Sequence, residues 1–471
     1  MNLPGQAGAL TQQRPTATTL RELLRVFFVV VAIKALLWWL DPTMRTFMGD
    51  SGSYLWSAVS NQPPPDRSFT YPLIIRATAL AHAHLAELGW LQSLFGSLLC
   101  VFVYRCLRVE LFVRPSVAFV VAALLAVDPG QLFFERMVMT ETIGTFCFVM
   151  MVIAGIRHVR HGHVRSLLAM ALFGMLVASL RLSLLPVVLG FAPLPVLARL
   201  LEDRGRWLRG GLHLAVALAA TLLSHSVYKH WYDNKSDALE RSDYTHSSGR
   251  MRLGLLAPLV KPEHLLRAGL PGELVAQTDP SSGDPRNREA QIWSDTGLFA
   301  LMAKHSPHPD DSARKVAMYA FRDDPAGLLR LGVGNLLDYF DGGIARWRMQ
   351  DDLGTRPPDD GMIAIISERF GYDARGVATR SSPVYAYYAG SRWYWTLMLF
   401  ALPLLAAAAG WRGRRRDPAM AALLSLLGLG MFASHVLFSH IVSFRYLHPM
   451  AVIVAMLVAY LPALRADADR R

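Results

Sequence analysis

The sequence predicts an all-α polytopic membrane protein, and three observations support this prediction. Of its 471 residues, 53% are hydrophobic and only 18% are charged, which is a low charged fraction for a soluble chain. The apolar residues occur in separate blocks of the length that crosses a bilayer. Arginines gather in short clusters between these blocks, as in chains whose orientation in the membrane is set by positive charge.

A span-length window gives about ten candidate transmembrane helices. They run approximately over residues 23–40, 86–104, 116–134, 138–156, 166–180, 183–199, 210–227, 393–410, 418–437 and 446–462. If the N-terminus is cytoplasmic, the inward loops hold most of the arginines, including those of WRGRRR at 411–416. The positive-inside rule therefore predicts that both termini are cytoplasmic. The arginine- and alanine-rich composition further indicates a bacterial inner membrane.

This topology divides the chain into segments. They are a cytoplasmic tail (1–22), a transmembrane core (23–227) with an outward loop (41–85), an extracytoplasmic domain (228–392), C-terminal transmembrane helices (393–462) and a cytoplasmic tail (463–471). The 228–392 segment is too long for a connector, so we expect a small domain of helices and loops resting on the membrane core. Helical periodicity is clear at 324–340. One face of that helix would carry Leu328, Leu331, Leu336 and Phe340.

The net charge of +12 does not indicate a nucleic-acid partner, because no basic stripe is interleaved with aromatic residues. Walker and dinucleotide fingerprints are absent from the sequence, so we expect no required cofactor. The stretch HSPHPDD at 305–311 could hold a divalent cation, but HxxH in a proline-broken loop favours a solvated loop. A divalent metal therefore stays open, with no residues assigned to it. The acidic pair Asp351–Asp352 fits a solvated turn, and Lys34 is expected to face the bundle interior or to snorkel.

Asp50 follows the first predicted span almost directly, in the stretch MGDSGSYLWSAV at 48–59. The residues after it, including Tyr54 and Trp56, predict a short helix in the membrane interface. Aspartate is among the best N-cap residues, so Asp50 would cap this helix. A carboxylate held at the membrane surface could also remove a proton from an acceptor hydroxyl as a general base. The two interpretations are compatible.

The chain then returns to the membrane through NQPPPDRSFTYP at 61–72, which carries Arg67 and Tyr71. The stretches GDSGSYLWSA at 49–58 and PPDRSFTYP at 64–72 resemble the first outward loop of the glycosyltransferase C superfamily. The similarity is greatest to protein mannosyltransferases and lipid A aminoarabinose transferases. In those enzymes the loop begins with an aspartate, followed by a tyrosine on an interfacial helix. Asp50 and Tyr54 are the matching residues here.

Three later stretches resemble the same superfamily and lie at the expected places in the topology. They are DPGQLFFERMVMTETIGTF at 128–146 with Glu141, RLSLLPVVLG at 181–190 with Arg181, and SFRYLHPM at 443–450 with Arg445, Tyr446 and His448. The resemblance covers about residues 21–200 and the C-terminal spans. Residues 230–390 match only loosely, mainly at 324–340.

The resemblance implies a GT-C-like bundle and an inverting enzyme that takes a hexosyl or pentosyl group from a polyprenyl-phosphate carrier. The acceptor hydroxyl would belong to a glycan, a lipid or a protein outside the cytoplasm. Asp50 would be the general base. Because the guanidinium fork suits phosphate, the departing phosphate would be bound by Arg445, with Arg181 and Arg67 as further candidates. The expected substrate-binding set also includes Tyr54, Tyr71, Tyr446 and His448.

Glu141 is the second candidate catalytic carboxylate, and it lies about one turn inside a predicted span, where charge is costly. It would position the acceptor or bind a metal. Its charge would also interact favourably with the positive end of its own helix, which explains the residue without any catalytic role. The resemblance of the TET stretch favours a functional role over the helix-end explanation, and the sequence does not choose between acceptor positioning and metal binding.

Two alternatives to glycosyl transfer remain open from the sequence. A flippase or transporter of lipid-linked sugars should show two related halves with broken helices, and no internal repeat is visible. An oligosaccharide ligase or polymerase would place outward arginines and a histidine in a large outward loop, and the 228–392 segment has both. The early Asp50 motif favours the transferase.

Overall fold

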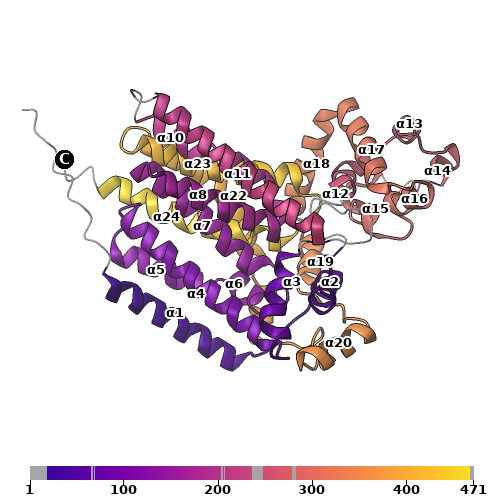
Figure 1. The fold of residues 1–471 in the computed structure, drawn as a ribbon, viewed down its shortest axis with the longest axis horizontal. Helices are drawn as coiled ribbons and strands as arrows, with labels where there is room; N and C mark the ends of the chain where they lie inside the picture. The colour runs from indigo at the N-terminus through magenta and orange to yellow at the C-terminus, as the bar shows by residue number, and fades with distance from the viewer. Residues whose placement is uncertain are drawn as a thin grey trace, which may run out of the picture.

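The computed structural model describes residues 19–64, 67, 69–202, 205, 207–235, 248–277 and 283–466. Most of the predicted N-terminal tail (1–22) and the last five residues lie outside this part of the chain. The elements in the described ranges are helices, and the only strand-like pairing there is an isolated bridge between Arg45 and Met137. The architecture is that of an all-helical polytopic membrane protein (Figure 1).

Eight helical segments of the described chain are long and apolar enough to cross a membrane. They are α1 (Leu20–Leu40), α4 (Ala86–Val109), α7 (Glu141–His161), the broken segment Leu182–Leu200, α11 (Trp207–Lys235), α22 (Arg392–Gly413), α23 (Pro418–Phe438) and the segment Phe444–Leu464, which includes most of α24 (His448–Ala466). Two shorter apolar helices lie at predicted spans, namely α5 (Pro115–Ala126) and α8 (Val164–Leu180). Each of the ten predicted spans thus coincides with helix, but the number that crosses the bilayer stays a prediction.

The predicted span 116–134 is not one helix. The first part, α5, ends at Ala126, and α6 (Pro129–Phe134) begins after Asp128. The carboxylate of Asp128 accepts a hydrogen bond from the N–H of Gln131 at 2.8 Å and so caps α6. Because Pro129 lacks an N–H group, it favours the start of a new helix rather than the continuation of the old one.

The centre of the bundle is formed by α7 and α24, whose residues are mostly buried. At the periphery, α1 exposes Phe28, Leu36 and Trp39, and α11 exposes Leu222 and Leu223. Such apolar exposure is expected for helices that face lipid. The central helices are thus buried within the protein, whereas the peripheral helices expose apolar side chains, as expected for a helical bundle surrounded by lipid.

The chain between α11 and α22 forms two unlike parts. Residues 248–277 and 283–323 build a small helical cluster with an apolar core of its own, which lies at one end of the bundle (Figure 1). Its helices are α12 (Ser248–Leu256), α13 (Pro262–Arg267), α14 (Gly272–Ala276), α15 (Ala290–Trp293), α16 (Leu298–His305) and α17 (Pro309–Asp323). The helices α18 (Pro325–Asp338), α19 (Gly342–Asp352), α20 (Asp360–Phe370) and α21 (Pro383–Ala389) instead contribute to the core of the bundle.

The helix predicted at 324–340 is confirmed as α18, but its apolar face differs in part from the prediction. Leu331 and Leu336 are buried and Leu328 is half-buried, whereas Phe340 lies beyond the helix end and is 52% exposed. There its ring lies 4.9 Å from that of Phe400. The buried face of α18 packs on α23 at Gly332, where a Cβ atom would lie only 2.2 Å from a backbone oxygen of α23.

Candidate functional site

Asp50 lies in the first turn of α2 (Met48–Ser60) and does not cap it. The N-cap residue is Phe47, and Ser51 accepts a hydrogen bond from the N–H of Phe47 at 2.7 Å. The same hydroxyl donates to the carbonyl of Val138 at 2.8 Å, which ties α2 to the segment before α7. The capping interpretation of Asp50 is therefore wrong. Its charge still lies at the positive end of a helix, and its side chain is available to more distant partners.

Those partners are two arginines from opposite ends of the sequence. One carboxylate oxygen of Asp50 pairs with Nη2 of Arg67, and the other lies 3.1 Å from Nη1 of Arg445. The three side chains are largely buried. Burial by itself raises the pKa of Asp50, but the two guanidinium groups outweigh it and hold that pKa below its usual range. Asp50 is therefore ionised at neutral pH.

The backbone of Arg445 is held in place by hydrogen bonds to the carboxylate of Asp352. It belongs to the short turn Phe444–Leu447 before α24, and the carboxylate of Asp352 accepts hydrogen bonds from the N–H groups of Phe444 (2.6 Å) and Arg445 (3.2 Å). The guanidinium lies 4.5 Å from the ring centre of Phe47 and 5.3 Å from that of Tyr446. Cation–π contacts of this kind orient the group without neutralising it. Tyr446 thus lies beside the predicted phosphate-binding arginine.

Asp352 is a residue whose role the sequence analysis missed. It ends α19 and is buried, not in a solvated turn as expected, and burial raises the pKa of its carboxyl to about 6. It also accepts a hydrogen bond from the hydroxyl of Ser443 at 3.0 Å. The acidic pair 351–352 gave no local signal of burial, because the residues that cover Asp352 come from the far end of the chain.

A second carboxylate–arginine pair, Glu141 and Arg181, lies close by. Oε1 of Glu141 is 3.7 Å from Nη2 of Arg181, and both side chains are buried. Nη2 of Arg181 also donates to the carbonyl of Arg445 at 3.3 Å, which connects the two pairs. The approach of Arg181 to α7 depends on Gly144, where a Cβ atom would lie 2.8 Å from the arginine side chain.

Each member of this second pair has a polar atom without a partner. Oε2 of Glu141 and Nη1 of Arg181 are buried and make no hydrogen bond with any described residue. Because buried polar atoms are nearly always hydrogen-bonded in native proteins, these two atoms require a partner such as water, an ion or a substrate group. Glu141 is also the first residue of α7, so the favourable helix-end interaction applies as well.

The two predicted tyrosines of the first loop pack together. The rings of Tyr54 and Tyr71 meet edge to face with their centres 5.1 Å apart, and both residues are buried. The hydroxyl of Tyr71 donates to the side-chain oxygen of Gln92 at 2.9 Å. Burial raises the pKa of both phenols, so they are neutral at physiological pH. Their contact packs α2 against α3 (Thr70–Ile75).

His448 belongs to a different environment from Arg445. Its Nε2 lies 3.1 Å from the side-chain oxygen of Gln131, and its Nδ1 lies 3.3 Å from the hydroxyl of Thr145. Gln131 in turn donates to Glu135, which pairs with Lys34 of α1. Within the described residues, the polar contacts of His448 are thus to this interior network and not to the arginines around Asp50.

The small helical cluster reaches the site through Trp293. The guanidinium of Arg67 lies 5.8 Å from the centre of that ring, and Arg250 lies 4.8 Å from it. In the HSPHPDD stretch, Asp310 accepts hydrogen bonds from the N–H groups of Gly249 (3.1 Å) and Arg250 (2.9 Å). Asp310 therefore has a structural role at the start of α12. The described ranges contain no group of three or more metal-ligating side chains.

Comparison of the chain with protein-family models and with curated protein sequences gives no match. Its function therefore has to be inferred from these residues and their geometry. The site combines an ionised carboxylate, two guanidinium groups in contact with it and a neighbouring buried pair with unused polar atoms. Such a set can bind an anionic group and hold a proton acceptor beside it.

Proposed function

We propose that this protein is a membrane glycosyltransferase that moves a sugar from a polyprenyl-phosphate carrier to an acceptor hydroxyl on the extracytoplasmic side, with inversion. One observation carries the proposal: Asp50 and Arg67 of the first loop form one ion-pair cluster with Arg445, which lies near the other end of the chain. A base and a cationic phosphate site are the two groups that this reaction needs most.

In the proposed reaction, the acceptor oxygen attacks the anomeric carbon while the bond from that carbon to the phosphate oxygen breaks. The acceptor proton passes to the carboxylate of Asp50. The departing polyprenyl phosphate gains negative charge, which the guanidinium of Arg445 stabilises through charge-assisted hydrogen bonds. No redox cofactor or nucleotide takes part in this balance.

The contact between Asp50 and Arg445 also gives the donor a way to activate the base. While both arginines bind the carboxylate, its pKa is depressed and it is a weak base. A donor phosphate competes for the same guanidinium groups. When they turn toward phosphate, Asp50 loses part of its cationic stabilisation and its pKa rises toward the range that suits proton removal. Donor binding would therefore precede acceptor activation.

Glu141 and Arg181 fit the acceptor side of this scheme. Their unused polar atoms, Oε2 and Nη1, can hydrogen-bond to hydroxyl groups of an acceptor. Because Arg181 also holds the carbonyl of Arg445, an acceptor bound there would lie beside the donor phosphate. We therefore assign acceptor positioning, rather than metal binding, to Glu141.

The proposal is tested by following the fate of the donor lipid in proteoliposomes of the purified full chain. We expect synthetic polyprenyl-monophosphate hexose or pentose, together with acceptors extracted from the envelope, to yield free polyprenyl phosphate. Movement of intact donor across the bilayer without bond cleavage would instead establish transport. Turnover of polyprenyl diphosphate donors alone would establish a ligase or polymerase and contradict the monophosphate scheme.

A further inference from the structure

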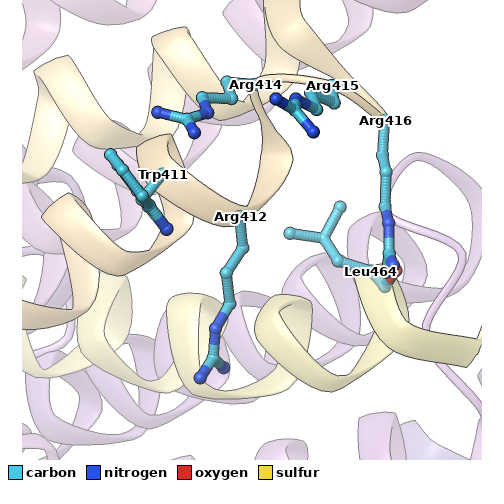
Figure 2. Close-up of a pocket in the computed structure, with 6 residues that line it drawn as sticks. All are labelled: Trp411, Arg412, Arg414, Arg415, Arg416 and Leu464. Carbon is cyan, nitrogen blue, oxygen red and sulfur yellow. The ribbon is translucent and has the colours of Figure 1, made fainter.

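A strongly basic pocket of about 330 Å³ lies between the end of α22 and the end of α24. It is lined by Trp411, Arg412, Arg414, Arg415, Arg416 and Leu464. Figure 2 shows the four arginine side chains arranged around the pocket, with Trp411 on one side and Leu464 on the other. The proposed reaction uses none of these residues.

The pocket lies at the opposite end of the bundle from Asp50. Arg445 precedes α24, and Leu464 is near the other end of that helix, as its course toward the C-terminus shows (Figure 1). A helix of 19 residues is about 28 Å long, close to the thickness of the hydrocarbon core of a bilayer. The pocket and Asp50 therefore lie at opposite membrane surfaces.

The positive charge of the pocket is not neutralised by the described part of the chain. Arg416 donates a hydrogen bond to the carbonyl of Leu464, one of the carbonyl groups at the C-terminal end of α24. The guanidinium of Arg414 lies 3.6 Å from the ring centre of Trp411. Neither contact removes charge. Arg412 and Arg415 form no ion pair with a described residue and are exposed.

The nearest carboxylate in sequence, that of Asp417, is already bound elsewhere. Its two oxygens accept hydrogen bonds from Arg160 at 2.9 and 2.6 Å, and one of them also accepts from the hydroxyl of Tyr460 at 3.1 Å. Asp417 is therefore bound to residues of α7 and α24 and does not neutralise the arginines of the pocket. This leaves the four arginines of the pocket as an anion-binding set.

An apolar stripe on α22 leads to this anion-binding set. Leu397, Leu404 and Trp411 recur every seven residues, so they lie near one face of the helix, and they are 62%, 72% and 67% exposed. Leucines at such positions of a spanning helix contact acyl chains, and tryptophan is enriched where the chains meet the headgroups. A free phosphate would use the arginines but would have no need of the stripe.

We propose that this pocket binds the phosphate-diester headgroup of an anionic phospholipid, with an acyl chain lying along Leu404 and Leu397. The arginine forks hold the phosphate oxygens, and Trp411 marks the depth of the headgroup. Basic pockets between helix ends are established sites for anionic lipids at the cytoplasmic surface. The proposal is independent of the reaction assigned to Asp50.

The test is lipid binding to the purified full chain in detergent, measured by native mass spectrometry with phosphatidylglycerol and phosphatidylcholine of equal chain length. We expect one saturable phosphatidylglycerol site with a preference of about tenfold or more over phosphatidylcholine. The double variant Arg412→Gln/Arg415→Gln should lower the affinity for phosphatidylglycerol about tenfold. The matched control Arg114→Gln/Arg165→Gln removes the same charge from exposed arginines at the ends of α5 and α8, and should change it by less than about twofold.

Equal losses in the two double variants would show general attraction of a basic protein for anionic lipid and would overturn the pocket. An unchanged affinity in the Arg412/Arg415 variant would do the same. A competition arm separates the two sources of phosphate. If inorganic phosphate displaces phosphatidylglycerol at a similar concentration, the pocket binds free phosphate and the lipid assignment is wrong. Retention of the lipid in excess inorganic phosphate supports it.

Discussion

Oδ2 of Asp50 lies 3.1 Å from Nη1 of Arg445, although 395 residues separate the two along the chain. The contact joins the loop between α1 and α4 to the turn before α24. Arg67 binds the other oxygen of the same carboxylate. Two cations keep this largely buried carboxylate ionised. In the proposed reaction, the guanidinium of Arg445 would exchange the carboxylate for the donor phosphate.

The variant Asp50→Asn tests the general base. We expect sugar transfer to fall about a hundredfold or more, because an amide cannot take up the acceptor proton. Initial rates of polyprenyl phosphate release measure the effect, and an unchanged elution profile in detergent checks folding. The exposed Asp295, changed to Asn, is the control and should keep the original rate. Near-normal turnover in the Asp50 variant would show that the base is another group.

The variant Arg445→Ala tests the phosphate site. Loss of a charge-assisted hydrogen bond should weaken binding of polyprenyl phosphate about tenfold or more, and Arg445→Lys should restore part of it. Binding of the product lipid is measured directly, so the identity of the sugar is not needed. The exposed Arg375, changed to Ala, provides a control of equal charge. If both alanine variants bind the lipid equally well, Arg445 does not hold the phosphate.

The variant Glu141→Gln tests acceptor positioning. We expect a higher KM for the acceptor, with affinity for polyprenyl phosphate unchanged, because Oε2 of Glu141 is the atom assigned to the acceptor. Steady-state kinetics with both substrates varied separates the two effects. Inhibition by a chelator that magnesium reverses, in the original protein but not in the variant, would favour the metal-binding interpretation of Glu141 instead.

Asp352 should give the protein a pH-dependent stability. Burial raises the pKa of its carboxyl to about 6, whereas an unfolded aspartate titrates near about 3.9. The folded state therefore binds the proton more tightly, and the free energy of unfolding contributed by this group increases as the pH falls from about 6 to about 4. Thermal unfolding in detergent across this range measures it. In Asp352→Asn this contribution should vanish, and an identical pH profile would contradict the assignment.

The buried pair of Lys34 and Glu135 should be strongly coupled, so that removing the lysine alone destabilises the bundle. Glu135 also accepts hydrogen bonds from Ser93 (3.0 Å) and Gln131 (2.7 Å), so removing its cation leaves a buried charge. We expect Lys34→Met to destabilise the protein by about 3–5 kcal/mol. The double variant Lys34→Met/Glu135→Gln should recover much of this loss, because it removes both charges. Unfolding in a denaturing detergent measures both variants, and additive losses would show that the pair is not coupled.

Features that depend on local sequence were predictable. The apolar blocks determined where the helices lie, because a segment that must bury its backbone in lipid has to be helical and of sufficient length. The break of the third predicted span was not predicted, although its cause is local: Asp128 and Pro129 favour a helix start. The sequence also brought Asp50 and Arg445 to the same predicted side, because each lies beside the end of a span.

Only the tertiary structure decided which charges meet. No periodicity relates Asp50 to Arg67 and Arg445, buries Asp352 under the turn before α24, or turns His448 toward Gln131 and not toward the arginines. The sequence left Lys34 either facing the bundle interior or snorkelling, and the structure buries it against Glu135. The physical reason is that ion pairing and desolvation act between segments distant in sequence. Helix formation and membrane insertion, in contrast, are largely decided within each segment.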